Sequence, residues 1–309
     1  MNRKCSLWVE KWRPVRVKDV VMPSAFHKYF ANIIETGNVP NLLLYSSTPG
    51  TGKTTIAKAL ANDLGVIPLY INASEEGGID TLRNQIKEFA QTKSFDKKTK
   101  IVILDEFDGT SPQFQGALRA FLEEFANSCR FILTANYITK VIPALQEGRT
   151  VVWDFNMSKK EYREELNELI FTRICGILKY ENVKFDEDVI RQLITAYSPS
   201  MRKLLATLQK YSETYDKIDE GIIQFRNIGT ELSDLLKAHK VTEARNYCNS
   251  NGYSPQDIYK NIFDNLIPQL TKNKSQAIIT LADYSYRTDL CSQPDLQVAA
   301  CFIEMISFL

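Results

Sequence analysis

The sequence has no closely spaced cysteine pair and no long apolar run. Its six cysteines contain no CxxC pair, so neither a zinc module nor a disulfide framework is indicated. No stretch approaches the roughly 20 apolar residues of a membrane span, and the N-terminal residues lack the apolar stretch of a signal peptide. We expect a cytoplasmic protein with no membrane partner and with reduced, mostly buried thiols at Cys5, Cys129, Cys175, Cys248, Cys291 and Cys301.

The charge of the chain is nearly balanced, at +1 over 309 residues. This value neither favours nor excludes a polyanionic partner, because a local basic stripe can bind phosphates on a neutral protein. With 44% hydrophobic and 24% charged residues, the chain is globular. It is long enough for two or three domains of roughly 100–150 residues each. DNA binding must therefore be judged from where the charges lie.

Five short apolar runs alternate with helical patterns between residues 41 and 155. They read LLLY, PLYIN, IVILD, FILTAN and VVWDF. Amphipathic patterns between the runs predict helices at 54–64, 79–90 and 113–124. This alternation predicts an α/β domain over residues 1–157, with a parallel sheet covered by helices on both faces.

After the fifth run the strand pattern stops, and helical patterns fill the rest of the sequence. Residues 158–218 are predicted to form a small helical domain whose helices break at Asn182 and at Ser198-Pro199. Residues 219–309 are predicted to form a third, all-α domain. Its clearest helical segments are 231–238, 255–266 and 294–308.

A glycine-rich segment, STPGTGKT, lies between a predicted strand and a predicted helix, which is the setting of a P-loop. Gly50 and Gly52 let backbone N–H groups approach phosphates, and Lys53 neutralises the β and γ oxygens. The hydroxyl of Thr54 is a Mg²⁺ ligand in this pattern. Ser47 replaces the usual first glycine, but the residues that cradle the phosphates remain. We predict that ATP and Mg²⁺ bind here.

Two acids end the third apolar run, in IVILDEFD. Asp105 is predicted to hold the Mg²⁺ shell, and Glu106 to polarise the attacking water as general base. The next run ends in Asn136, which can orient the same water beside the γ-phosphate. A lone acidic pair is more often a solvated strand end, and a lone asparagine an ordinary turn residue. The upstream P-loop favours the catalytic interpretation.

Together these segments resemble the AAA+ ATPase subunits of sliding-clamp loaders, the replication factor C small subunits and the T-even-phage type. The resemblance covers roughly residues 7–210, and several of its segments are not shared by generic P-loop enzymes: LWVEKWRP, NASEEGGIDTLRNQIKEFAQTKSF, ALRAFLEE and SPSMRKLLATLQ. It implies an AAA+ domain with a helical lid and a C-terminal collar domain. It also implies primer–template DNA, a sliding clamp and other loader subunits as partners, in a ring or spiral that is a pentamer in the family.

The resemblance assigns further ATP contacts. It places the adenine pocket at Val9, Glu10, Lys11, Trp12 and Val21. It places the lid's contact with the γ-phosphate at Arg202, which would otherwise be taken for a surface residue. The full predicted ATP-binding set is Val9, Glu10, Lys11, Trp12, Val21, Gly50, Thr51, Gly52, Lys53, Thr54, Thr55 and Arg202, with Thr54 and Asp105 as Mg²⁺ ligands.

The resemblance also implies an arginine finger that reaches the ATP of a neighbouring subunit, normally from a Ser-Arg-Cys triplet. This chain has Glu147-Gly148-Arg149 at that place, so Arg149 is the candidate finger, displaced by an extra residue. The alternative is a surface arginine at a helix-to-strand turn. Without a finger, interfacial hydrolysis should be weak, since such a group contributes on the order of 10³–10⁵ in rate. The predicted catalytic set is Lys53, Asp105, Glu106, Asn136 and Arg149.

A basic face is predicted on the helix of GIDTLRNQIKEFAQ, where Arg83 and Lys87 are four residues apart. With Thr81 near the helix N-terminus, they could contact a phosphate backbone. Most such charge pairs are solvated faces. The resemblance favours DNA, because this segment lines the interior of the family's spiral. Such contacts would be salt-sensitive and independent of sequence.

The sequence therefore predicts an ATPase subunit of a DNA sliding-clamp loader. ATP binding would order a spiral that opens the clamp and grips DNA, and hydrolysis would release the closed clamp. By analogy, residues 113–124 could contact the clamp, or they could be core. Another DNA-directed AAA+ ATPase, such as a helicase loader or branch-migration motor, should lack WVEKWRP and the GIDTLRNQIKEFAQ helix. A further alternative is a structural subunit that binds ATP without hydrolysing it. The intact Lys53, Asp105, Glu106 and Asn136 argue against this alternative, and the missing Ser-Arg-Cys triplet argues for it.

Overall fold

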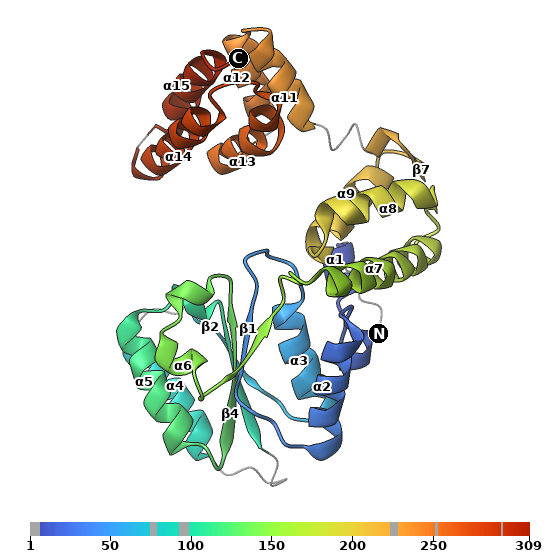
Figure 1. Ribbon diagram of the computed structural model, residues 1–309. Helices are drawn as coiled ribbons and strands as arrows, with labels where there is room; N and C mark the ends of the chain where they lie inside the picture. Colours follow the sequence, from blue (N-terminus) through green and yellow to red (C-terminus); the bar gives the residue numbers. More distant parts are fainter. Residues whose placement is uncertain (1–6, 75–78, 93–98, 223–227, 251–252, 292) are drawn as a thin grey trace. The chain divides into compact units, whose positions relative to one another are not determined.

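The computed structural model describes residues 7–74, 79–92, 99–222, 228–250, 253–291 and 293–309. The chain forms two compact units, Met1–Ile218 and Asp219–Leu309 (Figure 1). The first unit carries the sheet and the helices packed on it. The second unit is helical in its described residues. The predicted division into three domains, 1–157, 158–218 and 219–309, stays a prediction.

A five-stranded parallel sheet with the order β2-β3-β4-β1-β5 forms the centre of the first unit. Its strands are β1 (Leu42–Tyr45), β2 (Leu69–Asn72), β3 (Lys100–Asp105), β4 (Cys129–Ala135) and β5 (Val151–Asp154). The three inner strands are almost wholly buried on both faces, as continuous apolar runs in a parallel sheet require. The predicted α/β fold is confirmed.

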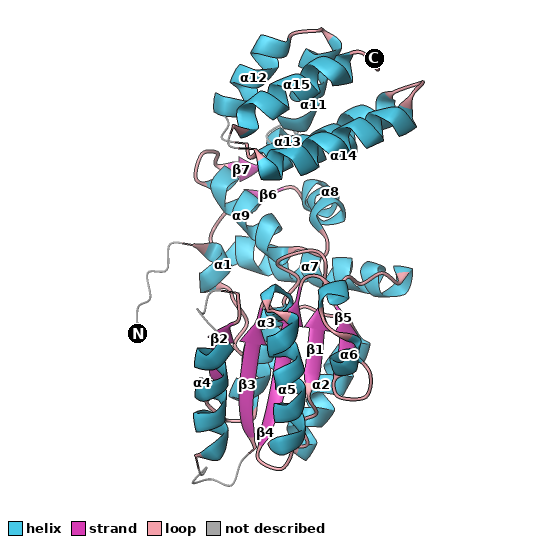
Figure 2. Cartoon of the chain, turned by 90° about the vertical axis from the view of Figure 1, so that its left-hand side faces the viewer, coloured by secondary structure: helices cyan, strands magenta, loops and turns pink. Residues whose placement is uncertain are grey.

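Helices cover both faces of this sheet (Figures 1 and 2). On one face lie α2 (Ser24–Thr36) and α3 (Lys53–Asp63), and on the other lie α4 (Ile79–Gln91), α5 (Pro112–Glu124) and the short α6 (Pro143–Gln146). Parallel strands need such crossovers, and each helix buries its apolar stripe against the sheet. All five strands therefore run in the same direction, and the P-loop, the acidic pair and Asn136 all follow strand C-termini at one edge.

Short helices punctuate the connections. They are α1 (Trp8–Lys11), η1 (Val17–Asp19), η2 (Phe107–Gly109) and η3 (Ile138–Lys140). The segment from η1 to α2 is held on the sheet domain because Val17, Val20 and Met22 are buried there. The N-terminal α1 instead packs on a helix of the following region, α9.

Three helices form the lid region after β5. They are α7 (Lys160–Tyr180), α8 (Glu187–Tyr197) and α9 (Met201–Ser212). The predicted breaks are confirmed, since α7 ends just before Asn182, which has a positive φ of 57°, and α8 ends before Ser198-Pro199. The prediction that strands stop after the fifth run is wrong. Strands β6 (Lys184–Phe185) and β7 (Lys217–Ile218) pair in parallel, and two residues are too few to show an alternating pattern in the sequence.

The second unit packs its helices around one apolar core. They are α11 (Ile228–Lys237), α12 (Val241–Ser250), α13 (Pro255–Asn261), the π-helix η4 (Ile262–Leu266), η5 (Ile267–Gln269), α14 (Lys274–Leu290) and α15 (Pro294–Ile306). The core includes Leu236, Ile262, Phe302 and Met305. Among the described residues, no helix combines the length and apolar composition needed to cross a membrane. Four of the five described cysteines are buried, and all five are free thiols.

Candidate nucleotide site

The P-loop between β1 and α3 adopts a conformation that requires glycine. Gly50 and Gly52 have φ values of +82° and +98°, which L-residues rarely adopt. A Cβ atom on Gly50 would lie 2.7 Å from the Cβ of Arg202 and 2.8 Å from Oγ of Ser200. Ser200 also donates a hydrogen bond to the Pro49 carbonyl at 2.8 Å. The glycine therefore allows both the turn and the close approach of the lid.

The departure at Ser47 has a structural explanation. Its backbone N–H and its hydroxyl both donate to Oδ1 of Asn156, at 2.9 and 2.8 Å. Asn156 lies two residues after the end of β5, and Ser46 donates to the same oxygen at 3.2 Å. A side chain at position 47 thus ties the start of the P-loop to the neighbouring strand, an interaction that glycine could make only with its backbone.

Asp105 is the last residue of β3 and is only 8% exposed. One carboxylate oxygen, Oδ1, accepts from the Thr54 hydroxyl at 2.8 Å and also from the Thr134 hydroxyl. The other, Oδ2, accepts from the Tyr70 hydroxyl at 2.7 Å. The structure thus brings together the two residues predicted to bind Mg²⁺. Hydroxyl and carboxylate oxygens are ligands that Mg²⁺ prefers, so the residues fit this ion.

Tyr70 and Thr134 were not predicted, although they hold the orientation of Asp105. Such outer contacts fix the orientation of a metal-binding carboxylate. Tyr70 lies on β2 and Thr134 on β4, the two strands that flank β3. The only sequence signal is one hydroxyl-bearing residue within each apolar run, Tyr70 in PLYIN and Thr134 in FILTAN. The sequence does not indicate which carboxylate each hydroxyl contacts.

Lys53 and Asn136 also meet at the site. The Lys53 ammonium donates to the carbonyl of Ser46 and to Oδ1 of Asn136, each at 3.1 Å, and the side chain is nearly buried. Burial lowers the pKa of Lys53 to about 8, and the nearby Asp108 and Asp105 carboxylates partly oppose that shift. A buried ammonium of this kind is stabilised by a ligand that brings negative charge, as a triphosphate does.

Glu106 is exposed and borders the same cavity. Its φ of 54° places it in the left-handed region. Its backbone N–H donates to Thr134 at 3.1 Å, and its carboxylate accepts from the Ser74 hydroxyl at 2.7 Å. The backbone is therefore fixed while the carboxylate remains open to water. This arrangement suits a proton acceptor.

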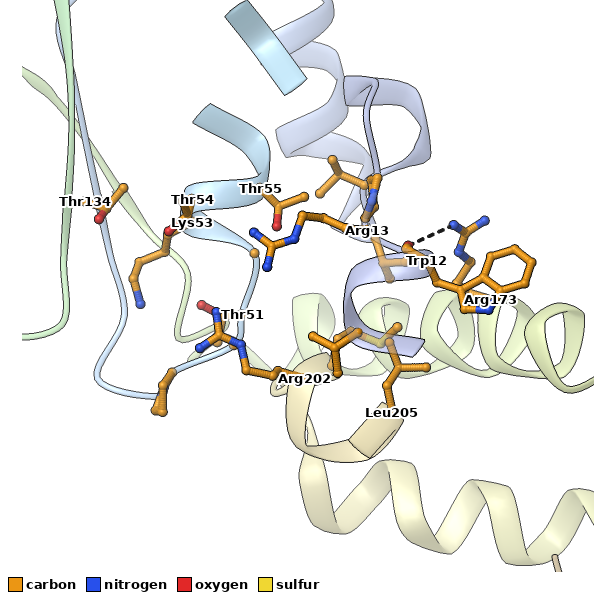
Figure 3. A pocket seen from close by; sticks show the side chains of 18 of the residues that line it. Trp12, Arg13, Thr51, Lys53, Thr54, Thr55, Thr134, Arg173, Arg202 and Leu205 are labelled. Carbon is orange, nitrogen blue, oxygen red and sulfur yellow. Dashed lines mark hydrogen bonds between the residues drawn. The ribbon is translucent and has the colours of Figure 1, made fainter. Parts of the chain in front are cut away.

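The cavity is lined by the N-terminal segment, the P-loop and the lid (Figure 3). Predicted residues that line it are Val9, Trp12, Val21, Gly50, Thr51, Gly52, Lys53, Thr54, Thr55, Asp105, Glu106, Asn136 and Arg202. Arg13 and Arg202 point toward the P-loop threonines in Figure 3. Lining residues that were not predicted include Arg13, Pro14, Val20, Arg173, Met201 and Leu205.

Two predicted adenine contacts do not line the cavity. Glu10 forms an ion pair with Arg13, and the Lys11 ammonium lies 2.7 Å from a carboxylate oxygen of Glu181. Val9 and Trp12 are three residues apart and share one side of this helical turn, so they border the cavity while the side chains of Glu10 and Lys11 bind protein. Arg13 was within the quoted WRP motif, which is the signal that could have identified it.

The comparisons with known proteins agree with this geometry. Residues 43–153 match the AAA family, the ATPase family associated with various cellular activities. The replication factor C small subunit of Methanococcus maripaludis is 32% identical over 96% of this chain and 98% of its own length. This chain belongs to the clamp-loader family. It is therefore a clamp-loader-type AAA ATPase, and the predicted ATP hydrolase activity is confirmed at the level of the family.

Further relatives fit the same family. The sliding-clamp-loader large subunit of Escherichia phage RB69 is 32% identical over 78% of this chain and 75% of its own length. Replication factor C subunit 5 of Mus musculus is 36% identical over 74% of this chain and 68% of its own length. Among solved structures, the Thermotoga maritima RuvB Holliday junction branch migration motor matches with a TM-score of 0.53 and 12% identity, covering 79% of this chain and 86% of RuvB. That likeness shows the fold alone.

Arg149 lies outside the cavity of its own chain, in the turn between α6 and β5. Its guanidinium donates to one oxygen of Glu123, at 2.9 and 3.0 Å, and to the carbonyl of Ala144 at 3.1 Å. The structure thus separates Arg149 from the other four predicted catalytic residues. A finger would act on the ATP of a neighbouring subunit, so the role of Arg149 stays a prediction.

The proposed DNA-binding helix, α4, has the predicted amphipathic division. Ile86 is fully buried, whereas Lys87 is exposed and Arg83 is partly buried. The side chain of Thr81 lies outside the described residues. The candidate clamp-contact helix, α5, has both kinds of face: Phe114 and Leu118 are core residues, and Arg119 is exposed.

Proposed function

We propose that this clamp-loader ATPase works as one subunit of a ring or spiral, a pentamer by its resemblance, that loads a sliding clamp onto primer–template DNA. The observation that carries the proposal is the convergence of Lys53, Asp105, Glu106 and Asn136 on one cavity. These residues occur in a chain whose relatives of 32–36% identity are clamp-loader subunits. ATP binding between subunits orders the spiral, and hydrolysis releases the closed clamp.

We propose ATP with Mg²⁺ as the ligand of the cavity. Thr54 and Asp105 would hold the ion, which supplies charge neutralisation at the phosphates when bound. The P-loop N–H groups, Lys53 and Arg202 bind the phosphates. Glu106 accepts a proton from the attacking water, which Asn136 orients. Val9, Trp12 and Val21 provide an apolar wall for the base, and the lid excludes bulk water from one side.

ATP turnover tests this function. We expect slow turnover by the purified chain, and synergistic stimulation when its partner subunits, its clamp and primed DNA are added together. Stimulation by DNA that is indifferent to the clamp would instead indicate another DNA-directed AAA ATPase. Absence of turnover in every mixture, with ATP binding retained, would indicate a structural subunit.

We propose that α4 contacts the DNA backbone through Arg83 and Lys87. We expect Lys87→Ala to weaken binding of the assembled loader to primer–template DNA equally for different sequences. The plot of log K against log salt has a negative slope, and this slope should become less steep by about one, because a phosphate contact releases about one counterion. Fluorescence anisotropy at several salt concentrations measures this slope.

Lys160→Ala is the matched control for that substitution. Lys160 is an exposed lysine on α7, outside the proposed DNA-binding helix. The substitution Lys160→Ala should leave the slope of log K against log salt at the wild-type value. An unchanged slope in Lys87→Ala as well would remove Lys87 from the DNA interface.

A further inference from the structure

One carboxylate of the lid contacts both Lys11 of the N-terminal helix α1 and Trp12, which follows it. Glu181, which follows α7 directly, lies with its two carboxylate oxygens 2.7 and 2.9 Å from the Lys11 ammonium. The same carboxylate accepts a hydrogen bond from the Trp12 indole N–H at 2.6 Å. The Glu181 side chain is only 14% exposed. An ion pair shielded in this way contributes more than a fully solvated one.

Other lid residues hold the same segment. The backbone N–H of Trp8 donates to Oε1 of Gln209, on α9, in a buried bond of 2.7 Å. The ring of Tyr180 packs on the Trp12 ring with centroids 4.9 Å apart. The guanidinium of Arg173, on α7, lies 5.8 Å from the Trp12 ring centroid. Figure 3 shows this arginine beside Trp12, with a hydrogen bond to its backbone carbonyl.

A few residues later the chain is bound to the sheet domain instead. The backbone N–H of Val17 donates to Asp63, on α3, at 2.8 Å, and η1 packs on α2 and α3. Residues 13–16 therefore cross from the lid to the sheet domain, and Arg13 and Pro14 line the cavity as they cross. The cavity wall at Val9 and Trp12 is thus positioned by the lid, although both residues fall within the predicted α/β domain of residues 1–157.

We propose that Glu181 is a positioning residue for nucleotide binding, which makes residues 8–12 a structural part of the lid. By fixing Lys11 and Trp12, it holds Val9 and Trp12 in the cavity wall whenever the lid is in place. Glu181 does not itself line the cavity. The inference rests on the proposed function only in that the nucleotide occupies this cavity.

Removing the carboxylate should lower nucleotide affinity. In Glu181→Ala, the Lys11 ammonium and the Trp12 N–H lose their partner, and residues 8–12 are held by fewer contacts. We expect the Kd for ATP to rise about tenfold, the order expected for loss of a partly buried charged hydrogen bond. KM for ATP in the assembled loader should rise with it, whereas kcat should change little, because the catalytic carboxylate and the P-loop are untouched.

Two further substitutions separate the contacts. Glu181→Gln keeps a carbonyl oxygen for Trp12 but removes the ion pair, and Lys11→Met removes the same ion pair from the other side. Both should raise the Kd by similar, smaller factors than Glu181→Ala. The matched control is Glu168→Ala. Glu168 lies on α7 and pairs with Arg191 of α8 at 2.6 Å, so it joins lid helices to each other and does not contact α1.

The experiment titrates the full-length chain with a fluorescent, ribose-labelled ATP and records the thermal midpoint of each variant. Weaker binding in Glu181→Ala but not in Glu168→Ala, at comparable thermal midpoints, supports the proposal. Wild-type affinity in Glu181→Ala, or an equal loss in both variants, overturns it. Failure of the wild-type chain to bind nucleotide would overturn the proposed nucleotide site itself, a result distinct from the failure of Glu181.

Discussion

Replacing Glu106 by Gln is expected to abolish ATP turnover and to leave nucleotide affinity near the wild-type value. The amide has the size of the carboxylate and its oxygen can still accept from Ser74, so the local structure should persist. It cannot take a proton from the attacking water. General-base catalysis contributes on the order of 10²–10⁴-fold, so the remaining rate should be small. Steady-state turnover of the assembled loader and equilibrium binding of labelled ATP measure the two effects.

Glu35→Gln is the control for the loss of one carboxylate. Glu35 is exposed on α2 and does not line the cavity, so its substitution should change neither quantity. Turnover retained in Glu106→Gln would exclude Glu106 as the base. Lost binding in that variant would show instead that the carboxylate supports the architecture of the nucleotide site.

Arg149→Ala is expected to reduce turnover of the assembled loader by a factor on the order of 10³–10⁵, the contribution of an arginine finger. ATP binding by the isolated chain should be unchanged, because Arg149 lies outside the cavity of its own chain. In the structure its guanidinium is paired with Glu123. Contact with a neighbour's γ-phosphate requires that exposed pair to open, which costs little because solvent screens it.

The control for Arg149 lies beside it. Arg119 is more exposed than Arg149, and its guanidinium lies 4.0 Å from the same oxygen of Glu123. Arg119→Ala therefore removes a second arginine near this carboxylate without removing the candidate finger. An equal loss in both variants would assign the effect to the surface around α5. Unchanged turnover in Arg149→Ala would make it an ordinary surface arginine, as the missing Ser-Arg-Cys triplet allowed.

The relation to branch-migration motors depends on which comparison is used. RuvB shares the fold at 12% identity, which does not identify an activity. Clamp-loader subunits share 32–36% identity over 68–98% of their own length. The structure gives the LWVEKWRP segment a physical role, because it borders the nucleotide cavity and is bound to the lid.

Much of the site was determined by sequence alone, because its signals are local. The P-loop needs glycines and a lysine within a few consecutive residues, and each buried strand is one apolar run. Asp105, Glu106 and Asn136 were predicted together because strand ends in a parallel sheet meet at one edge. Arg83 and Lys87 were assigned to one helix face by their spacing of four residues alone.

Tertiary structure decided the contacts between residues far apart in the chain. Lys11 pairs with Glu181, which is 170 positions away in the sequence, and Tyr70 donates a hydrogen bond to Asp105, which is 35 positions away. No periodicity encodes such pairs, since each depends on how separate elements pack and which rotamer a long side chain adopts. The sequence by itself therefore predicted the fold class, the P-loop and the two acids that border the same cavity. Only the folded chain assigned Lys11 to the lid, bound Ser47 to Asn156 and made Glu181 a neighbour of the nucleotide site.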